Sequence, residues 1–203
     1  MNKPANMNRR RHFLGAGALS ALAAPSLGLA QHAPKGVRGP VLLTVSGLVG
    51  AGNRGRLDPA LDQMMAKQKI SFDRAQVFDF AALTALPAVT IRPTLEYDAK
   101  AHSLKGPLLL DVMKASGVKA SGKTTFFLRA VDGYAAQVSA ADAGKYRFII
   151  ATHLDGQPMA LGGLGPLWAV YDADRFADMA AKPLSDRFAW CPWATYHIEV
   201  KEA

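Results

Sequence analysis

Leu104–Met113 has the sequence LKGPLLLDVM and contains the start of the clearest helix in the chain. We expect this helix to run from Pro107 to Ala115, because leucines and other good helix formers follow the proline. Gly117 is placed to close it, since glycine readily adopts the left-handed conformation in which many helices end. The stretch therefore predicts one short helix, and the other elements are assigned on either side of it.

Short apolar segments and short helices surround this helix, without an internal repeat. We expect extended segments at residues 41–49, 77–78, 89–92, 124–131, 135–138, 147–152, 167–171 and 195–200. Further helical segments are expected at residues 58–69, 79–86, 139–145 and 172–181. Strands and helices that alternate so irregularly predict a compact α+β domain, and the length of the chain suits one such domain.

Five motifs occur in an order that resembles a known family. They are residues 80–86, 104–113, 130–134, 150–158 and 165–171. Together they resemble the molybdopterin-binding domain of the sulfite-oxidase type, over about residues 41–202. The resemblance implies a compact mixed α/β fold whose loops hold a molybdenum-molybdopterin cofactor. It also implies a cysteine thiolate on the metal and transfer of an oxo group to or from the substrate.

The position of the metal-ligating cysteine holds no sulfur in this chain. In the family, that cysteine lies about a dozen residues before the glycine that opens the Leu-Leu-Asp helix; here the glycine is Gly106, and the count leads to Thr94. A threonine hydroxyl has a much higher pKa than a thiol and is a poor ligand for a soft metal site. The resemblance places Arg92 and Tyr134 beside the same pocket, so Arg92, Thr94 and Tyr134 are the candidate cofactor-binding residues and no metal ligand is assigned.

A second departure concerns the loop after residue 165, where relatives carry basic residues that hold the anionic cofactor. This chain has Asp172 and Asp174 there, which would repel an anion. Two functions follow as alternatives. The first is an accessory module that binds a small molecule or a membrane or periplasmic partner protein; the second is an active molybdenum-dependent oxidoreductase. Pairing with a membrane electron carrier is a further alternative.

Residues 1–30 predict a removable export signal of the twin-arginine type. Residues 8–14, NRRRHFL, contain the arginine pair, and an uncharged apolar stretch rich in Ala, Gly and Leu follows. Small residues up to Ala30 suit a signal peptidase, and the stretch is too weakly apolar for a membrane anchor. We therefore expect a signal at 1–30, a flexible leader at 31–40, a domain at 41–203 and a periplasmic location without a transmembrane anchor.

Charge and composition exclude several other functions. The net charge of +8 includes Lys3 and the three arginines 9–11 of the signal, so the exported part carries +4 without clustered basic residues, and nucleic acid is not expected as a partner. The sequence holds no paired Cys or His motif for zinc and no Gly-x-Ser-x-Gly elbow for a hydrolase. Cys191, the single cysteine, is interpreted as a buried apolar residue; a metal ligand or a redox thiol is the alternative.

Overall fold

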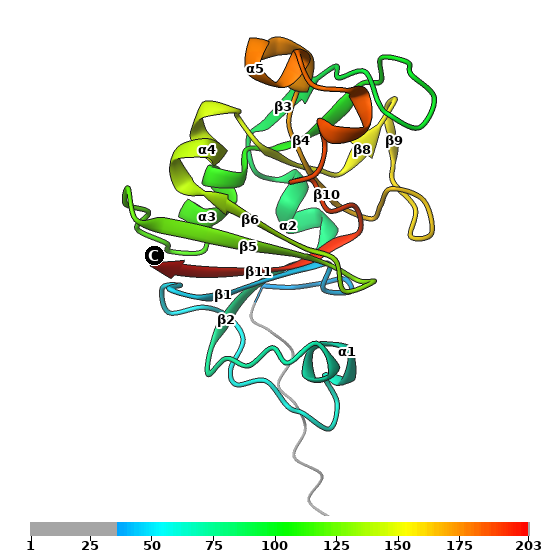
Figure 1. The fold of residues 1–203 in the computed structure, drawn as a ribbon. Helices are drawn as coiled ribbons and strands as arrows, with labels where there is room; N and C mark the ends of the chain where they lie inside the picture. The colour runs from blue at the N-terminus through cyan, green and yellow to red at the C-terminus, as the bar shows by residue number, and fades with distance from the viewer. Residues whose placement is uncertain (1–35, 203) are drawn as a thin grey trace, which may run out of the picture. The chain divides into compact units, whose positions relative to one another are not determined.

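A five-stranded sheet forms the base of the structure, a computed structural model that describes residues 36–202 (Figure 1). The order of its strands is β2-β1-β11-β5-β6, in which β1 and β11 are parallel and all other neighbours antiparallel. The bounds are β1 Leu43–Gly47, β2 Ala75–Phe78, β5 Thr124–Ala130, β6 Ala135–Ser139 and β11 Thr195–Glu202. The predicted export signal lies outside the described residues.

Two smaller sheets and several short helices complete the α+β architecture that the sequence predicts. The strands of the smaller sheets are β3 Ala88–Ile91, β4 Leu104–Pro107, β8 His153–Leu154 and β9 Gln157–Pro158, and separately β7 Ile149–Ala151 with β10 Trp168–Val170. The helices are α1 Gln63–Lys67, α2 Phe80–Thr84, α3 Leu109–Ala115, α4 Ala140–Lys145 and α5 Ala177–Ala180, with 3-10 turns η1 Ala173–Arg175 and η2 Leu184–Asp186. Within residues 36–202, none of the helices has the length and apolar character of a membrane span.

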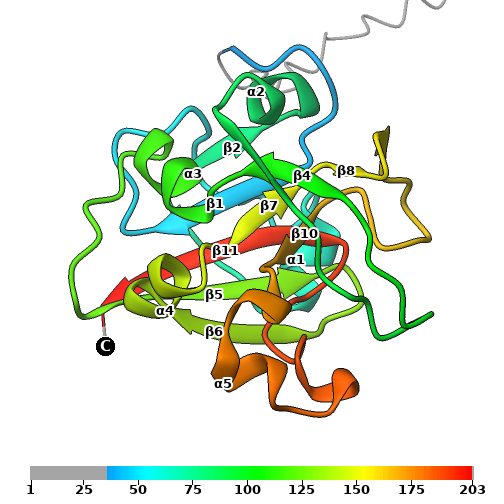
Figure 2. The same cartoon turned by 90° about the horizontal axis from the view of Figure 1, so that it is seen from above.

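The large sheet separates two hydrophobic cores of very different size. The main core lies on the side of α3 and α4, and α1 lies on the opposite side (Figures 1 and 2). The smaller core holds Leu57, Met65 and Ile70 against Tyr196 of β11. A register shift of β11 between Thr195 and His197 interrupts the regular alternation of its side chains at this point. The first six residues of β11 are buried or half-buried between the two cores, and its last two residues are exposed.

The stretch around Gly106 is a strand before it is a helix, which corrects the expected start at Pro107. Residues 104–107 form β4 and pair with β3, and α3 begins at Leu109. Pro107 closes the ladder opposite Ala88, at a strand end where a missing N–H costs nothing. A Cβ added to Gly106 would lie 1.9 Å from the carbonyl oxygen of Ile150, so only glycine permits β4 to approach β7 this closely.

Side chains cap two of the predicted helices, and one predicted helix is broken. Asp79 accepts a hydrogen bond from the Ala82 amide at the start of α2, and Ser139 accepts one from the Asp142 amide at the start of α4. The other oxygen of Asp79 accepts hydrogen bonds from the amides of residues 38 and 39, which belong to the predicted leader. The segment 172–181 is a 3-10 turn followed by the short α5, with Phe176 in extended conformation between them.

Candidate functional site

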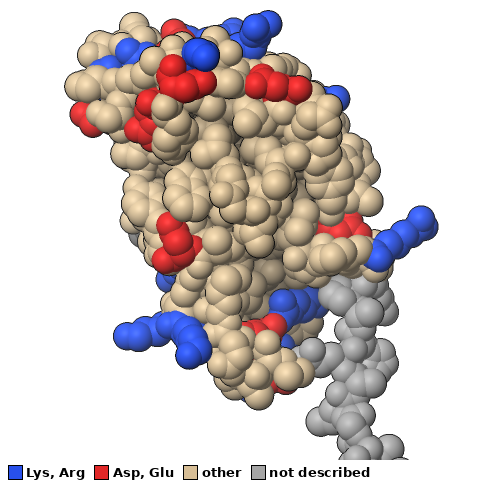
Figure 3. Space-filling view, turned by 90° about the vertical axis from the view of Figure 1, so that its right-hand side faces the viewer, with Lys and Arg blue, Asp and Glu red and all other residues tan. Residues whose placement is uncertain are grey.

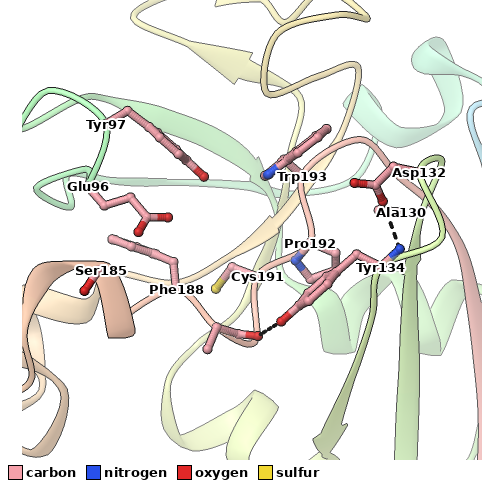
Figure 4. Close-up of a pocket in the computed structure, with 11 residues that line it drawn as sticks. Glu96, Tyr97, Ala130, Asp132, Tyr134, Ser185, Phe188, Cys191, Pro192 and Trp193 are labelled. Carbon is pink, nitrogen blue, oxygen red and sulfur yellow. Dashed lines mark hydrogen bonds between the residues drawn. The ribbon is translucent and has the colours of Figure 1, made fainter.

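An open pocket of about 220 Å³ lies where three segments of the chain meet (Figure 4). The segments are the loop between β3 and β4, the turn between β5 and β6, and the chain from η2 to β11. The lining residues are Glu96, Tyr97, Ala130, Asp132, Tyr134, Ser185, Phe188, Ala189, Cys191, Pro192 and Trp193. We call this the aromatic pocket.

Hydrogen bonds fix the walls of the aromatic pocket. The Tyr134 hydroxyl donates to the carbonyl of Ala189 at 2.6 Å, which ties the β5–β6 turn to the segment before β11 (Figure 4). The Tyr134 amide donates to Oδ1 of Asp132 at 2.9 Å, an Asx-type contact that orders the turn. Behind the pocket, Nε1 of the buried Trp168 donates to the carbonyl of Cys191 at 2.8 Å. The walls are therefore positioned before any ligand arrives.

The aromatic pocket is acidic, and its thiol is held neutral. Two carboxylates, Glu96 and Asp132, belong to the lining, which contains no Lys, Arg or His. Burial, and then the neighbouring Glu96, raises the pKa of Tyr97 to about 12. Burial also raises the pKa of the Cys191 thiol far above its ordinary value, and that side chain is only 4% exposed. A neutral thiol is a poor nucleophile and a poor metal ligand.

A second, apolar hollow of about 450 Å³ adjoins the aromatic pocket and shares Tyr97 and Trp193 with it. Its other lining residues are Val131, Leu161, Gly162, Gly163, Leu164 and Ala194. The face of the molecule that carries the loops 92–103 and 159–165 has a broad centre without charged side chains, and both acidic and basic side chains lie around it (Figure 3). The two hollows together form one continuous surface with an acidic part and an apolar part.

Of the three predicted site residues, Tyr134 lines the aromatic pocket, whereas Arg92 and Thr94 line neither hollow. The amide of Arg92 donates to Oδ2 of Asp172 at 3.2 Å, and the amide of Thr94 donates to Oδ2 of Asp174 at 2.7 Å. Asp174 also pairs with Arg187 at 2.8 Å. We call this arrangement the carboxylate clamp; the acids expected to repel an anion here instead accept hydrogen bonds from the backbone around Thr94.

A buried serine and histidine in the large sheet form a pair like that of a catalytic site, but the histidine cannot act as a base. Nε2 of His197 lies 2.9 Å from Oγ of Ser46, and both side chains are fully buried. Arg129 donates to Nδ1 at 3.3 Å, so Nε2 carries the proton and donates to the serine. Burial, and then Arg129, lowers the pKa of His197 to about 3. A histidine that donates to the serine cannot take its proton, so the pair serves the core.

The residues around Thr94 do not fit a thiolate-bound molybdopterin cofactor. The amides of Arg92 and Thr94, which could otherwise donate to an anion, are occupied by carboxylates. The nearby open pocket is acidic, which opposes an anionic phosphate-bearing group. Among residues 36–202, no group of three or more His, Cys, Asp or Glu side chains is arranged to hold a metal ion.

Sequence reasoning missed Glu96, Tyr97 and Phe188 as parts of a site. Glu96 and Tyr97 lie two and three residues after Thr94, so the segment that contains Thr94 leads into the pocket, although Thr94 itself does not line it. The signal that could have found the pocket is the Trp-Cys-Pro-Trp run at 190–193, an aromatic cluster close to the end of the chain. Of the two tryptophans in this run, Trp193 lines the pocket.

Comparison with known proteins supports the fold and little more. No family model matches the sequence, and no curated protein matches it significantly. The structure is similar to the crystal structure of the sulfane dehydrogenase SoxCD from Paracoccus pantotrophus, with a TM-score of 0.51 and 13% sequence identity. The similarity covers 79% of this chain and 38% of that chain. At this identity the likeness shows a related fold and carries no activity from one protein to the other.

Proposed function

We propose that this protein is an exported accessory module that binds a small molecule on a sulfite-oxidase-type fold and holds no molybdenum through a protein thiolate. The likeness to a sulfur-oxidising enzyme supports the fold on which the proposal rests. The open aromatic pocket, whose walls are already hydrogen-bonded in place, supports the binding role.

The carboxylate clamp is the observation that carries the proposal. The resemblance gives Thr94 the family's ligand position, and the clamp holds its backbone amide against Asp174. The chain's single thiol belongs to Cys191, on a different segment, where burial keeps it protonated. Neither residue can supply the soft, deprotonated sulfur that the family's metal requires.

The proposal places the module in the periplasm, after export by the twin-arginine route. The arginine pair and apolar stretch of residues 8–30 support this placement. This route carries proteins that have already folded, so the aromatic pocket would cross the membrane fully formed. A membrane or periplasmic partner protein would then receive or sense the bound molecule.

An active molybdenum-dependent oxidoreductase is the second candidate. It is favoured by the structural likeness to SoxCD, whose name is that of a dehydrogenase. The metal would then be held by the dithiolene alone or by an unexpected ligand. The two candidates differ in one measurable property, the molybdenum content of the protein.

The test is the molybdenum and pterin content of the protein purified from a host that makes the cofactor. We expect far less than one molybdenum per chain, and no fluorescent oxidation product of the pterin. Thr94→Cys serves as the matched variant, and we expect no gain in metal because the clamp still occupies the surrounding amides. Near-stoichiometric molybdenum in the unaltered protein would overturn the proposal in favour of the enzyme.

A further inference from the structure

The exposed aromatic side chains of the molecule are gathered at one place. Among residues 36–202, the exposed aromatic side chains are Tyr97 (55% exposed), Tyr134 (49%) and Trp193 (38%), and all three line the aromatic pocket. Other aromatic residues of this part of the chain are buried or half-buried. Exposed aromatic surface gathered around a hollow marks a binding site, because a folded protein otherwise buries such groups.

The charge of the aromatic pocket is opposite to that of the protein. The exported part of the chain carries a net charge of +4, yet the pocket has Glu96 and Asp132 in its lining and no basic side chain. Neither carboxylate forms a salt bridge within the described residues. In Figure 4 the carboxylate of Glu96 and the rings of Tyr97 and Trp193 surround a common space.

Aromatic rings and carboxylates around one cavity have a shared chemical preference. The negative face of an aromatic ring attracts a cation, and a tryptophan attracts it most strongly. A carboxylate adds a direct charge attraction, which is stronger at a partly enclosed site than in open water. Both kinds of group disfavour an anion, so the pocket selects for positive charge.

We propose that the aromatic pocket binds a small organic cation, a substituted amine or quaternary ammonium compound. This inference rests on the proposed ligand-binding function and names the class of ligand. The cationic group lies between Tyr97, Trp193 and the carboxylates. The apolar part of the ligand extends into the adjoining hollow, which Leu161 and Leu164 line and which shares Tyr97 and Trp193. The pocket volume of about 220 Å³ suits a compact head group.

The test compares two probes that differ in charge and have almost the same shape. Choline carries a quaternary nitrogen, and 3,3-dimethylbutan-1-ol has a carbon in the same place. Calorimetric titration of the purified full chain at low salt should show choline binding at least about tenfold more tightly than the neutral alcohol. Added salt should weaken choline binding, because it screens the carboxylates.

Three variants assign the effect to the pocket. Glu96→Gln and Trp193→Leu should each weaken choline binding about three- to tenfold, through loss of the charge and of the ring face respectively. Asp73→Asn removes the same charge as Glu96→Gln at a residue that lines neither hollow, and it should leave choline binding unchanged. Unfolding curves of all three variants check that the fold is intact.

The outcomes separate this inference from the proposed function. Equal binding of the two probes, or choline binding unaltered by Glu96→Gln and Trp193→Leu, would overturn the cation inference and leave a ligand-binding module of another specificity. Absence of choline binding would also overturn it. Failure of the proposed function appears elsewhere, as near-stoichiometric molybdenum in the purified protein.

Discussion

The loop that contains Thr94 and the segment that contains Cys191 differ in which of their groups a ligand can reach. The first contains Thr94, to which the resemblance gives the position of the metal-ligating cysteine, and the carboxylate clamp holds the amides of Arg92 and Thr94. Further along, the same loop lines the open pocket through Glu96 and Tyr97, and the second segment lines it too, although its thiol is buried. A position that a family resemblance assigns to ligand binding can thus be inaccessible to a ligand while residues close to it line an open pocket. Accessibility therefore has to be established for each residue separately.

The two segments also differ in how a histidine near each of them responds to protons. His102 belongs to the same loop as Thr94, since its amide donates to the carbonyl of Pro93. Hydrogen bonds to Asp155 and Asp98 raise its pKa. His197 lies on β11, just after Cys191, and burial lowers its pKa to about 3. The two histidines therefore predict opposite effects of acid.

The largest expected effect is loss of stability in acid, caused by His197. In the unfolded chain a histidine has a pKa of about 6.5, so the unfolded state takes up a proton first as the pH falls. The contribution of neutral His197 to the free energy of unfolding is complete above about pH 6.5. It is lost as the pH falls toward about 3, and the loss amounts to more than about 2 kcal/mol. Urea unfolding at a series of pH values measures it.

His102→Gln is the control for the acid effect. The raised pKa of His102 stabilises the fold below the ordinary histidine pKa and ceases to do so as the pH rises through the raised value. His102→Gln should therefore leave the acid-induced fall in place. If the free energy of unfolding of the His102→Gln variant does not fall between pH 6.5 and pH 4, the role given to His197 is wrong.

The next effect is on the carboxylate clamp. Asp172→Ala leaves the Arg92 amide without its partner at a side chain that is 7% exposed, and it should cost about 1–3 kcal/mol of unfolding free energy. Asp172→Asn keeps one acceptor oxygen, and the second carboxylate oxygen is buried without a partner in the described structure, so this change should cost less. Equal losses for both variants would show that charge, not the hydrogen bond, holds the loop.

The smallest expected effect is a difference in thiol reactivity between the two segments. The unaltered protein has its only cysteine at 191, where burial and a raised pKa should make the native thiol react slowly with Ellman's reagent. Thr94→Cys adds a thiol at a half-buried position, which should react faster. The release of thionitrobenzoate over time measures both. Rapid reaction of the unaltered native protein would show that Cys191 is accessible.

Local sequence predicts the helix caps, but it does not predict where every element begins or which residues form the site. Asp79 and Ser139 are recognisable as helix caps because capping depends on a few neighbouring residues. The sequence predicts Pro107 in a helix, whereas it ends β4. Its pairing with Ala88 of β3 is a contact between residues far apart in the chain, which a local pattern does not show. Thr94 was expected to face a pocket, yet its orientation depends on Asp174, a residue whose approach no local pattern shows.

The pocket lay beyond prediction for the same reason. It is assembled from three segments that are separated in sequence, and only the tertiary fold brings Tyr97, Tyr134 and Trp193 together. Tyr134 was placed there by resemblance alone. A single sequence shows which aromatic residues exist, but burial decides which of them remain exposed.

The most direct test of the account is the position of bound choline, observed through the indole N–H signals of an isotope-labelled full chain. The sequence has three tryptophans: Trp193 lines the pocket, whereas Trp168 is fully buried and Trp190 lines neither hollow. The account predicts that the signal of Trp193, assigned with Trp193→Leu, moves most on titration and that the signal of Trp190 stays in place. A titration that leaves the Trp193 signal unmoved would contradict the account.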